Sequence, residues 1–204
     1  MRVQVPPPAP IGIGSMRFEL FFLGRIPSGN KGGPHPNFAV DFRTQMHHQL
    51  VRLWKTNPLI EHTRWLSKPY NSNTWEGVAT FERHGLDFVV VASQRVSLSI
   101  KMDVHFYEPA GELSVASDVA DVDNRVKVLF DLLRLPDNPK HVPPGLLPHY
   151  CLMEDDRLVW ELTVKRHRLL RTLEKVEYMT RLDISVLPSR GAMGNLSIVD
   201  TSVY

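Results

Sequence analysis

Residues 118–131 read DVADVDNRVKVLFD, and the prediction for the whole chain starts from this stretch. Two carboxylates, Asp121 and Asp123, stand two residues apart; Asn124 follows directly, and Lys127 comes four residues after Asp123. Apolar residues then recur at spacings of three and four, which is the period of one helical face. These residues are Val126, Leu129, Phe130 and Leu133. We therefore predict a loop that carries acids into an amphipathic helix, with Asp123 or Asn124 as its N-cap.

A second acidic segment, residues 154–156 (EDD), follows further along the chain. In an extended segment Asp121 and Asp123 project to the same side, and Asp156, in a turn before a strand, can reach the same place. Three carboxylates suit Mg²⁺ and can support displacement at a phosphodiester. Lys127, one helical turn after Asp123, can neutralise charge that develops on the phosphate. Ordinary helix capping and an ordinary acidic loop explain the same residues, so spacing alone leaves both interpretations open.

The acidic motifs resemble a known family. Residues 121–127 (DVDNRVK), followed by 130–131 (FD) and later by 155–159 (DDRLV), look like the signature of the RusA family of Holliday-junction resolvases. Residues 24–30 (GRIPSGN) are similar to the first strand and the Pro-Ser-Asn loop of that family. The resemblance covers the chain from Arg17 to Leu187.

The resemblance implies a RusA-like fold and a homodimeric endonuclease that uses Mg²⁺, with Mn²⁺ as the alternative ion. Such an enzyme resolves four-way DNA junctions in recombination and repair, so branched DNA is the implied partner and no small-molecule substrate is expected. The implied metal-binding and catalytic carboxylates are Asp121, Asp123 and Asp156, and Lys127 is the implied active-site lysine. Asn124 and Asp155 match adjacent motif positions and are candidate accessory residues.

The chain departs from the family pattern in three places. Residues 136–153 form a proline-rich insert, the strands between Val78 and Ala92 look like an added hairpin, and residues 111–120 carry acids where family members can carry basic residues. Two other functions stay open. One is a non-catalytic DNA-binding or assembly protein with the same fold, and the other is a metal-dependent nuclease for other branched DNA or for RNA.

The net charge of +2 does not by itself indicate a nucleic-acid partner, but the charge is unevenly distributed. Residues 1–100 carry 11 Lys and Arg against 6 Asp and Glu, whereas residues 101–204 carry 13 against 16. A basic surface attracts a polyanion while acids can hold a metal. The candidate DNA contacts are Arg25, Lys31, Lys165, Arg166 and Arg168. A solvated loop and a solvated strand end are the alternative interpretations of these residues.

The remaining periodicity predicts an α+β domain in which two main helices pack on a mixed β-sheet. Runs rich in β-branched and aromatic residues indicate strands, and apolar stripes indicate helices. The predicted strands are residues 16–24, 78–81, 87–92, 96–106, 157–164 and 178–187, and the predicted helices are 38–55 and 121–135. We predict a hairpin turn at residues 83–85 and irregular structure over 56–75 and 136–150. One face of residues 96–106 should be buried and the other partly wet.

We expect one domain over residues 16–188, with residues 1–15 as a disordered leader and 189–204 as a loose tail. The leader holds three consecutive prolines and lacks the apolar core of a signal peptide, and Met16 is an alternative start. No run approaches the roughly 18 apolar residues of a membrane span, so no membrane partner is expected. The expected location is the cytoplasm, in a bacterial or phage-encoded protein as the family suggests.

The histidines and the single cysteine form no recognisable zinc motif. His47 and His48 are adjacent and cannot share one helical face, so we expect them at the surface or partly buried. His141, His149 and Cys151 fit no usual ligand spacing and lack a fourth ligand. Cys151 is predicted to be a small buried apolar residue, and a single cysteine excludes an intramolecular disulfide.

Overall fold

The computed structural model describes residues 15–29, 33–109, 119–169 and 178–190, with residues 195 and 198; of residues 119–121 it describes the backbone alone. This part of the chain has the predicted α+β class. The α-helices are α1 (Pro36–Leu53) and α2 (Val119–Leu133), and the 3-10 helices are η1 (Leu59–Leu66), η2 (Pro139–His141) and η3 (Asp156–Leu158). The strands are β1 (Met16–Leu23), β2 (Thr80–Arg83), β3 (Leu86–Ala92), β4 (Leu98–Pro109), β5 (His149–Met153), β6 (Val159–Leu169) and β7 (Met179–Pro188).

Several predictions fall outside the described residues. They concern the leader before residue 15, most of the tail after residue 190, the acidic loop of residues 110–118, and Lys31. None of the helices that the structure describes is long and apolar enough to cross a membrane.

The seven described strands form two mixed sheets where the sequence predicted one. The larger sheet has the order β1-β7-β4-β6, in which only the pair β4 and β6 is parallel. The smaller sheet has the order β2-β3-β5, with β2 antiparallel and β5 parallel to β3. The single-sheet prediction is wrong because pairing between distant strands leaves no periodic signal in the sequence.

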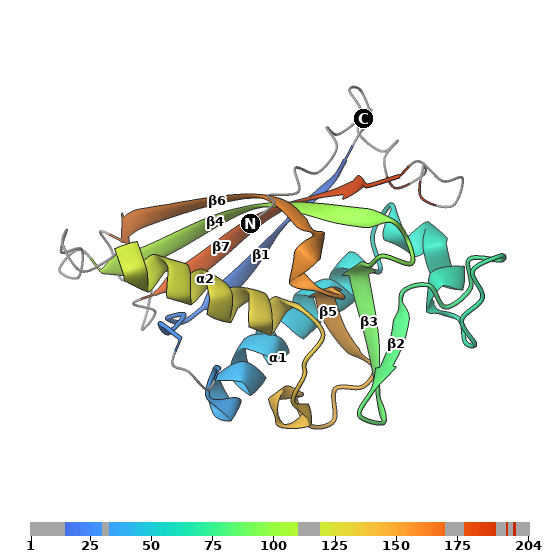
Figure 1. Cartoon of the computed structure of the whole chain (residues 1–204), viewed down its shortest axis with the longest axis horizontal. Coiled ribbons are helices and arrows are strands. Elements are labelled where there is room, and N and C mark those ends of the chain that lie inside the picture. The colour runs from blue at the N-terminus through green and yellow to red at the C-terminus, as the bar shows by residue number, and fades with distance from the viewer. Residues whose placement is uncertain are drawn as a thin grey trace, which may run out of the picture.

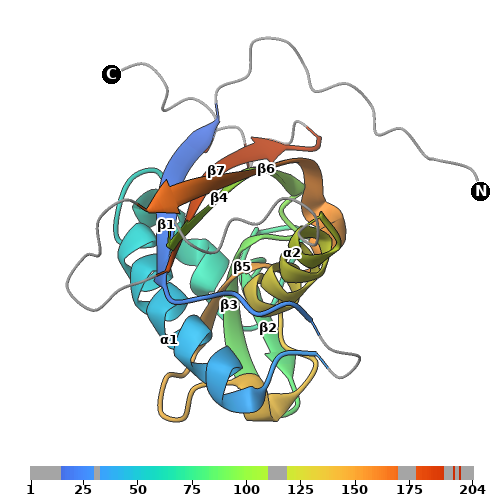
Figure 2. The same cartoon turned by 90° about the vertical axis from the view of Figure 1, so that its left-hand side faces the viewer.

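Figures 1 and 2 show the larger sheet as one layer, with α1, α2 and the smaller sheet together on one side of it. On the side of β4 that faces α1 and α2, five alternate residues are fully buried and join the apolar core formed with these helices. They are Leu98, Ile100, Met102, Val104 and Phe106. The buried face predicted for this strand is confirmed, and no described helix covers the opposite face of the sheet.

Two segments that were predicted to be irregular contain regular structure. β5 has only five residues and follows a run of prolines, so the sequence shows no period there, and four of its five residues are buried. Strands covered on both faces lose the alternation that makes them recognisable. Residues 59–66 form η1, which buries Leu59 and Trp65.

The predicted hairpin turn between β2 and β3 is confirmed. His84 and Gly85 have φ angles of 55° and 70°, so both central residues lie in the left-handed region. A two-residue turn with this backbone matches the right-handed twist of the strands that it joins. Glycine at the second position adopts the conformation without steric cost.

Two glutamines of α1 close the outer edge of β1. The Gln49 side chain accepts a hydrogen bond from the Phe21 N–H at 2.9 Å and donates one to the Phe21 carbonyl at 2.7 Å. One helical turn earlier, Gln45 makes the same two contacts with Leu23, at 3.0 and 3.4 Å. These amides satisfy backbone groups that another strand would otherwise bind, so this edge of the sheet is closed at Phe21 and Leu23.

His149 begins β5 and is only 1% exposed. Its ring stacks on His47 of α1 with ring centres 5.2 Å apart, and its Nδ1 has no hydrogen-bond partner in the described part of the chain. Burial, aided by the charge of Arg43 and by His47, lowers the pKa of His149 to about 3. His47 is buried, whereas it was expected at the surface or partly buried, and its Nδ1 accepts a hydrogen bond from the Tyr150 N–H at 3.2 Å.

We predict that His149 makes the protein sensitive to acid. The unfolded chain protonates this ring near pH 6.5 and the folded chain only near pH 3, so its contribution to stability is complete above pH 6.5 and is lost as the pH falls. By pH 4.5, two pH units below the unfolded pKa, the loss is about 3 kcal/mol. The free energy of unfolding is measured in urea from about pH 7 to about pH 4.5. His149→Leu should lower its slope against pH by the equivalent of about one bound proton, because the unfolded wild-type chain protonates this ring in that range and the folded chain does not.

His84→Gln, in the exposed hairpin turn, is the control for this experiment and should keep the wild-type slope. An unchanged slope in His149→Leu contradicts the prediction.

Candidate functional site

The acidic stretch lies inside α2 and not ahead of it. Because α2 begins at Val119, Asp121 and Asp123 are both helical, and the prediction of Asp123 or Asn124 as the N-cap is wrong. Acids are also favoured in the first turns of a helix, where the macrodipole is positive, so they do not mark the cap unambiguously. Residues two apart on a helix do not share a face, so the extended geometry assumed for the two carboxylates is absent. The side chain of Asp121 lies outside the described residues.

Asp123 and Lys127 form an ion pair on the surface of α2. Lys127 Nζ lies 2.5 Å from Asp123 Oδ2, and the two side chains are 68% and 67% exposed. An exposed pair at this spacing stabilises a helix by only about 0.3–0.5 kcal/mol. Both groups are therefore accessible to a ligand at little cost to the fold.

The loop after β1 packs against the same part of α2. Arg125 Nε donates a hydrogen bond to the Ile26 carbonyl at 3.0 Å. A Cβ atom on Gly29 would lie 2.9 Å from Val128 Cγ2 and 3.6 Å from the Asn124 carbonyl, so the loop approaches the helix more closely than a larger residue allows. The structure thus brings together two of the segments that carry the family resemblance.

A buried charged cluster holds this region in place. Glu108 and Arg125 are each 2% exposed; Arg125 Nη1 contacts Glu108 Oε1, and Arg166 donates to Glu108 Oε2 at 2.9 and 2.6 Å. Burial by itself would raise the pKa of the Glu108 carboxyl, but the hydrogen bonds from Arg166 and Arg125 outweigh it and lower that pKa. Arg125 also lies over the Phe106 ring, 4.2 Å from its centre.

Arg166, a candidate DNA contact, is therefore engaged in the fold. The sequence did not indicate that Glu108 and Arg125 contact each other, since the two residues are 17 positions apart along the chain.

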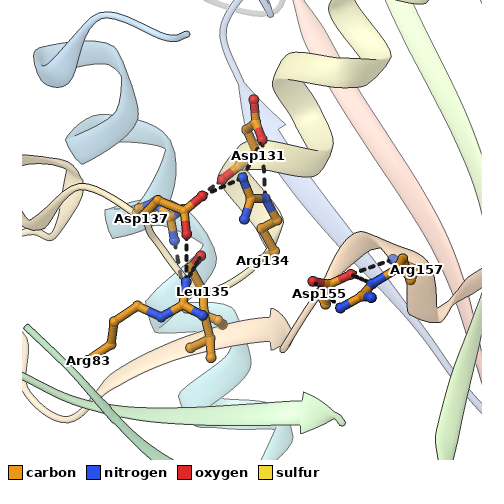
Figure 3. A network of polar contacts seen from close by, with 9 residues as sticks. Arg83, Asp131, Arg134, Leu135, Asp137, Asp155 and Arg157 are labelled. Carbon is orange, nitrogen blue, oxygen red and sulfur yellow. Dashed lines mark hydrogen bonds and ion pairs between the residues drawn. The ribbon is translucent and has the colours of Figure 1, made fainter. Parts of the chain in front are cut away.

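The second acidic segment has a separate role in local structure. Asp155 caps η3 by accepting hydrogen bonds from Arg157, from its N–H at 3.0 Å and its Nε at 2.8 Å (Figure 3). The side-chain hydrogen bond from Arg157 is the main reason that the pKa of Asp155 falls to about 2. Asp156 is exposed in the first turn of η3.

Asp123 and Asp156 lie toward opposite ends of α2. Asp123 is close to Arg125, which contacts Glu108 near the end of β4. Asp156 starts η3, which leads directly into β6, and the first residue of β6 pairs with Ile100 near the start of β4. Eight residues of extended strand between Ile100 and Glu108 span about 26 Å. Figure 1 shows the connection from β5 to β6 beside the C-terminal end of α2.

The two acidic segments therefore do not meet at Asp123 and Asp156, contrary to the sequence prediction. Within residues 15–190, leaving out the undescribed gaps, no three His, Cys, Asp or Glu side chains are placed to hold a metal ion.

A network of charges fixes the C-terminal end of α2 (Figure 3). Arg134 Nη2 lies 2.9 Å from Asp131 Oδ1 and 2.6 Å from Asp137 Oδ2. Arg83, from the β2–β3 hairpin, reaches the other oxygen of Asp137 at 2.7 Å and the Leu135 carbonyl at 3.4 Å. These contacts tie the end of the helix to the smaller sheet, so the network has a structural role.

The remaining described candidate DNA contacts come from two segments, the loop after β1 and strand β6. The Arg25 guanidinium stacks over the Tyr178 ring at 5.2 Å, beside the loop that packs on α2. Lys165 and Arg168 are exposed on β6.

A polar cleft on the open face of the larger sheet was not predicted. It encloses about 610 Å³, and its lining includes Arg17, Glu19, Lys101, Asp103 and Asp183. Glu19, Asp183 and Asp103 lie side by side on β1, β7 and β4. Asp103 and Asp183 each have one buried carboxylate oxygen without a hydrogen-bond partner in the described part of the chain. The sequence indicated only a partly wet face, because strand register decides which acids become neighbours.

His105 lies next to this cleft and links two polar groups. Its Nε2 is 3.3 Å from Asp183 Oδ2, and its Nδ1 is 2.8 Å from His167 Nε2. Burial lowers the pKa of His105, although Asp183 opposes the effect. The ring is therefore neutral at pH 7 and can donate to one neighbour while accepting from the other.

Comparison of the chain with family models, with curated proteins and with solved structures gave no match. The candidate function therefore depends on the residue pattern and on the geometry described above.

Glu108→Gln tests the buried cluster. The substitution leaves two guanidinium groups without their counter-charge, and we expect it to lower the free energy of unfolding by about 3–5 kcal/mol. Asp87→Asn removes the partner of Lys68 in an exposed pair and should cost less than about 1 kcal/mol. Urea unfolding measures both values. A Glu108→Gln variant as stable as the Asp87→Asn control contradicts the structural role of the cluster.

Proposed function

We propose that the protein is a metal-dependent endonuclease of the RusA type that cuts branched DNA, with the face of α2 that carries the exposed Asp123 and Lys127 as its catalytic face. The observation that carries the proposal is the contact between the segments DVDNRVK and GRIPSGN, which are distant in sequence and packed together through Arg125 and Gly29. Both segments resemble parts of one family signature. Their packing supports a common site.

The donor set at this site has the chemistry that Mg²⁺ takes. Mg²⁺ is usually held by one or two carboxylates together with water and substrate phosphate. In this proposal Asp123 is the described protein ligand, with water and substrate phosphate as the others. When bound, the ion would activate water and stabilise the oxygens of the reacting phosphodiester. The bond between phosphorus and the 3′ oxygen breaks and a bond between phosphorus and the water oxygen forms, leaving a 5′-phosphate and a 3′-hydroxyl.

The residues of α2 have separate roles in this proposal. Lys127 exchanges its contact with Asp123 for the substrate phosphate and offsets the charge that develops there. The backbone amides at the start of α2 carry the positive end of the helix dipole, which favours phosphate. Asp156, at the other end of α2, is not needed in this site. Its match to the family motif makes its substitution informative.

Asp123→Asn is the first test. We expect Mg²⁺-dependent cleavage of a four-way junction to fall on the order of 100-fold or more, with junction binding retained, because a ligand of the ion is lost while the fold is kept. Asp41→Asn, an exposed acid of α1, should cleave as the wild type does. Activity is measured as initial cleavage rate and binding by gel shift in Ca²⁺.

Asp156→Asn, assayed in parallel, should keep most of the activity. A loss as large as that of Asp123→Asn would mean that the two acids act together despite their separation. If the wild type cuts no branched substrate in Mg²⁺ or Mn²⁺, the enzyme proposal fails, and binding without cleavage supports a DNA-binding or assembly protein. Four-way, three-way, flap and linear substrates should be compared at one salt concentration, because affinity for DNA depends strongly on salt.

A further inference from the structure

The two edge strands of the larger sheet, β1 and β6, differ in the contacts of their outward backbone groups. At β1 the glutamines of α1 occupy the outward backbone groups of Phe21 and Leu23. At the other edge β6 is eleven residues long and pairs only with β4 among the described strands. A strand of this length with one unpaired side is a template for another strand.

The residues of β6 alternate between the two faces of the sheet. Glu161, Thr163 and Lys165 pair with Lys101, Asp103 and His105 of β4 and so lie on the open face. Leu162 and Val164 pair with Met102 and Val104, whose side chains point into the core. Leu162 is nevertheless 38% exposed, because nothing described packs beside it at the edge.

We propose that β6 pairs with β6 of a second copy of the chain, antiparallel and centred on Thr163. In this register Glu161 lies opposite Lys165 of the partner subunit, and Lys165 opposite Glu161 of the partner subunit. Leu162 lies opposite Val164 of the partner subunit, and Thr163 meets its own symmetry mate. Opposite charges, apolar pairs and Thr–Thr pairs are the cross-strand combinations that stabilise antiparallel strands.

The sequence of β6 selects this register over its neighbours. A shift by an odd number of residues would place core-facing side chains opposite solvent-facing ones. Centring the pair on Val164 would set Leu162 against Arg166 and Lys165 against Thr163. Centring it on Lys165 would set two lysines against each other. Trp160 is the extra residue of a β-bulge and ends the regular edge, so pairing is confined to the segment after it.

The pairing predicts the form of the assembly. A two-fold axis perpendicular to the sheet gives one continuous eight-stranded sheet, with the helices of both copies on the same face. The inference does not depend on the nuclease proposal, and its test uses neither DNA nor metal.

Charge reversal tests the register. Lys165→Glu and Glu161→Lys each place two pairs of like charges across the interface, and each variant alone should weaken the dimer at least about tenfold. An equimolar mixture of the two variants should recover the dimer, because every pair across a mixed interface is again of opposite charge. Sedimentation velocity over a concentration series measures the dissociation constants, and circular dichroism checks the fold. Lys55→Glu, an exposed lysine at the end of α1, should leave the dimer unchanged.

The results that overturn the inference are specific. They are a wild-type chain that stays monomeric up to about 100 µM, which corresponds to a binding free energy weaker than about −5.5 kcal/mol, a dimer insensitive to Lys165→Glu, a mixture that does not recover, or a Lys55→Glu variant that weakens the dimer equally. Recovery in the mixture excludes misfolding as the cause of the single-variant losses.

Discussion

The arrangement of the candidate site depends on one buried carboxylate, that of Glu108, which Arg125 and Arg166 share. Removing such a charge from water is costly unless each oxygen finds a donor, and here each oxygen contacts a guanidinium. The three residues come from β4, α2 and β6, and Arg125 adds the Ile26 carbonyl after β1. One carboxylate therefore orients four segments of the chain. The cost of leaving it unpaired opposes any arrangement in which one of them moves away.

The same constraint explains why the acidic segments stay apart. α2 is fixed near its start by Arg125 and at its end by Arg134, which contacts Asp131 and Asp137. A slide of the helix by one full turn would move it about 5.4 Å and break both sets of contacts. The distance along β4 between Ile100 and Glu108, which separates the surroundings of the two acids, is several times larger than one helical turn. Asp123 and Asp156 thus belong to different parts of the surface, and a shared motif order does not place them in one site.

The sequence predicted the elements whose signals are local. The alternation of β4 showed its buried face, and residues 83–85 (RHG) indicated the hairpin turn. β5 could not be found, because five mostly buried residues after a run of prolines carry no period. The start of α2 was misplaced because acids suit both a cap and a first turn. The buried state of Cys151 was predicted. Its Sγ lies 3.7 Å from Arg43 Nη1, and this contact was not predicted because the two residues are 108 positions apart in the sequence. The Glu108 cluster was missed for the same reason: its members meet only through the register of distant strands.

Register also accounts for the difference between the two sheet edges. Four residues of helix rise about 6 Å and two residues of strand about 6.7 Å, so two side chains one turn apart on α1 can match two alternate residues of β1. Gln45 and Gln49 use this match at Leu23 and Phe21. The mismatch of about 0.7 Å grows with each repeat, and the next position on α1 is Leu53, which has no amide to offer. A helix can therefore close only a short edge in this way. No described helix makes such contacts with β6. The pairing of another strand with its outer edge is instead restricted by the bulge at Trp160 and by charges that favour one register over the others.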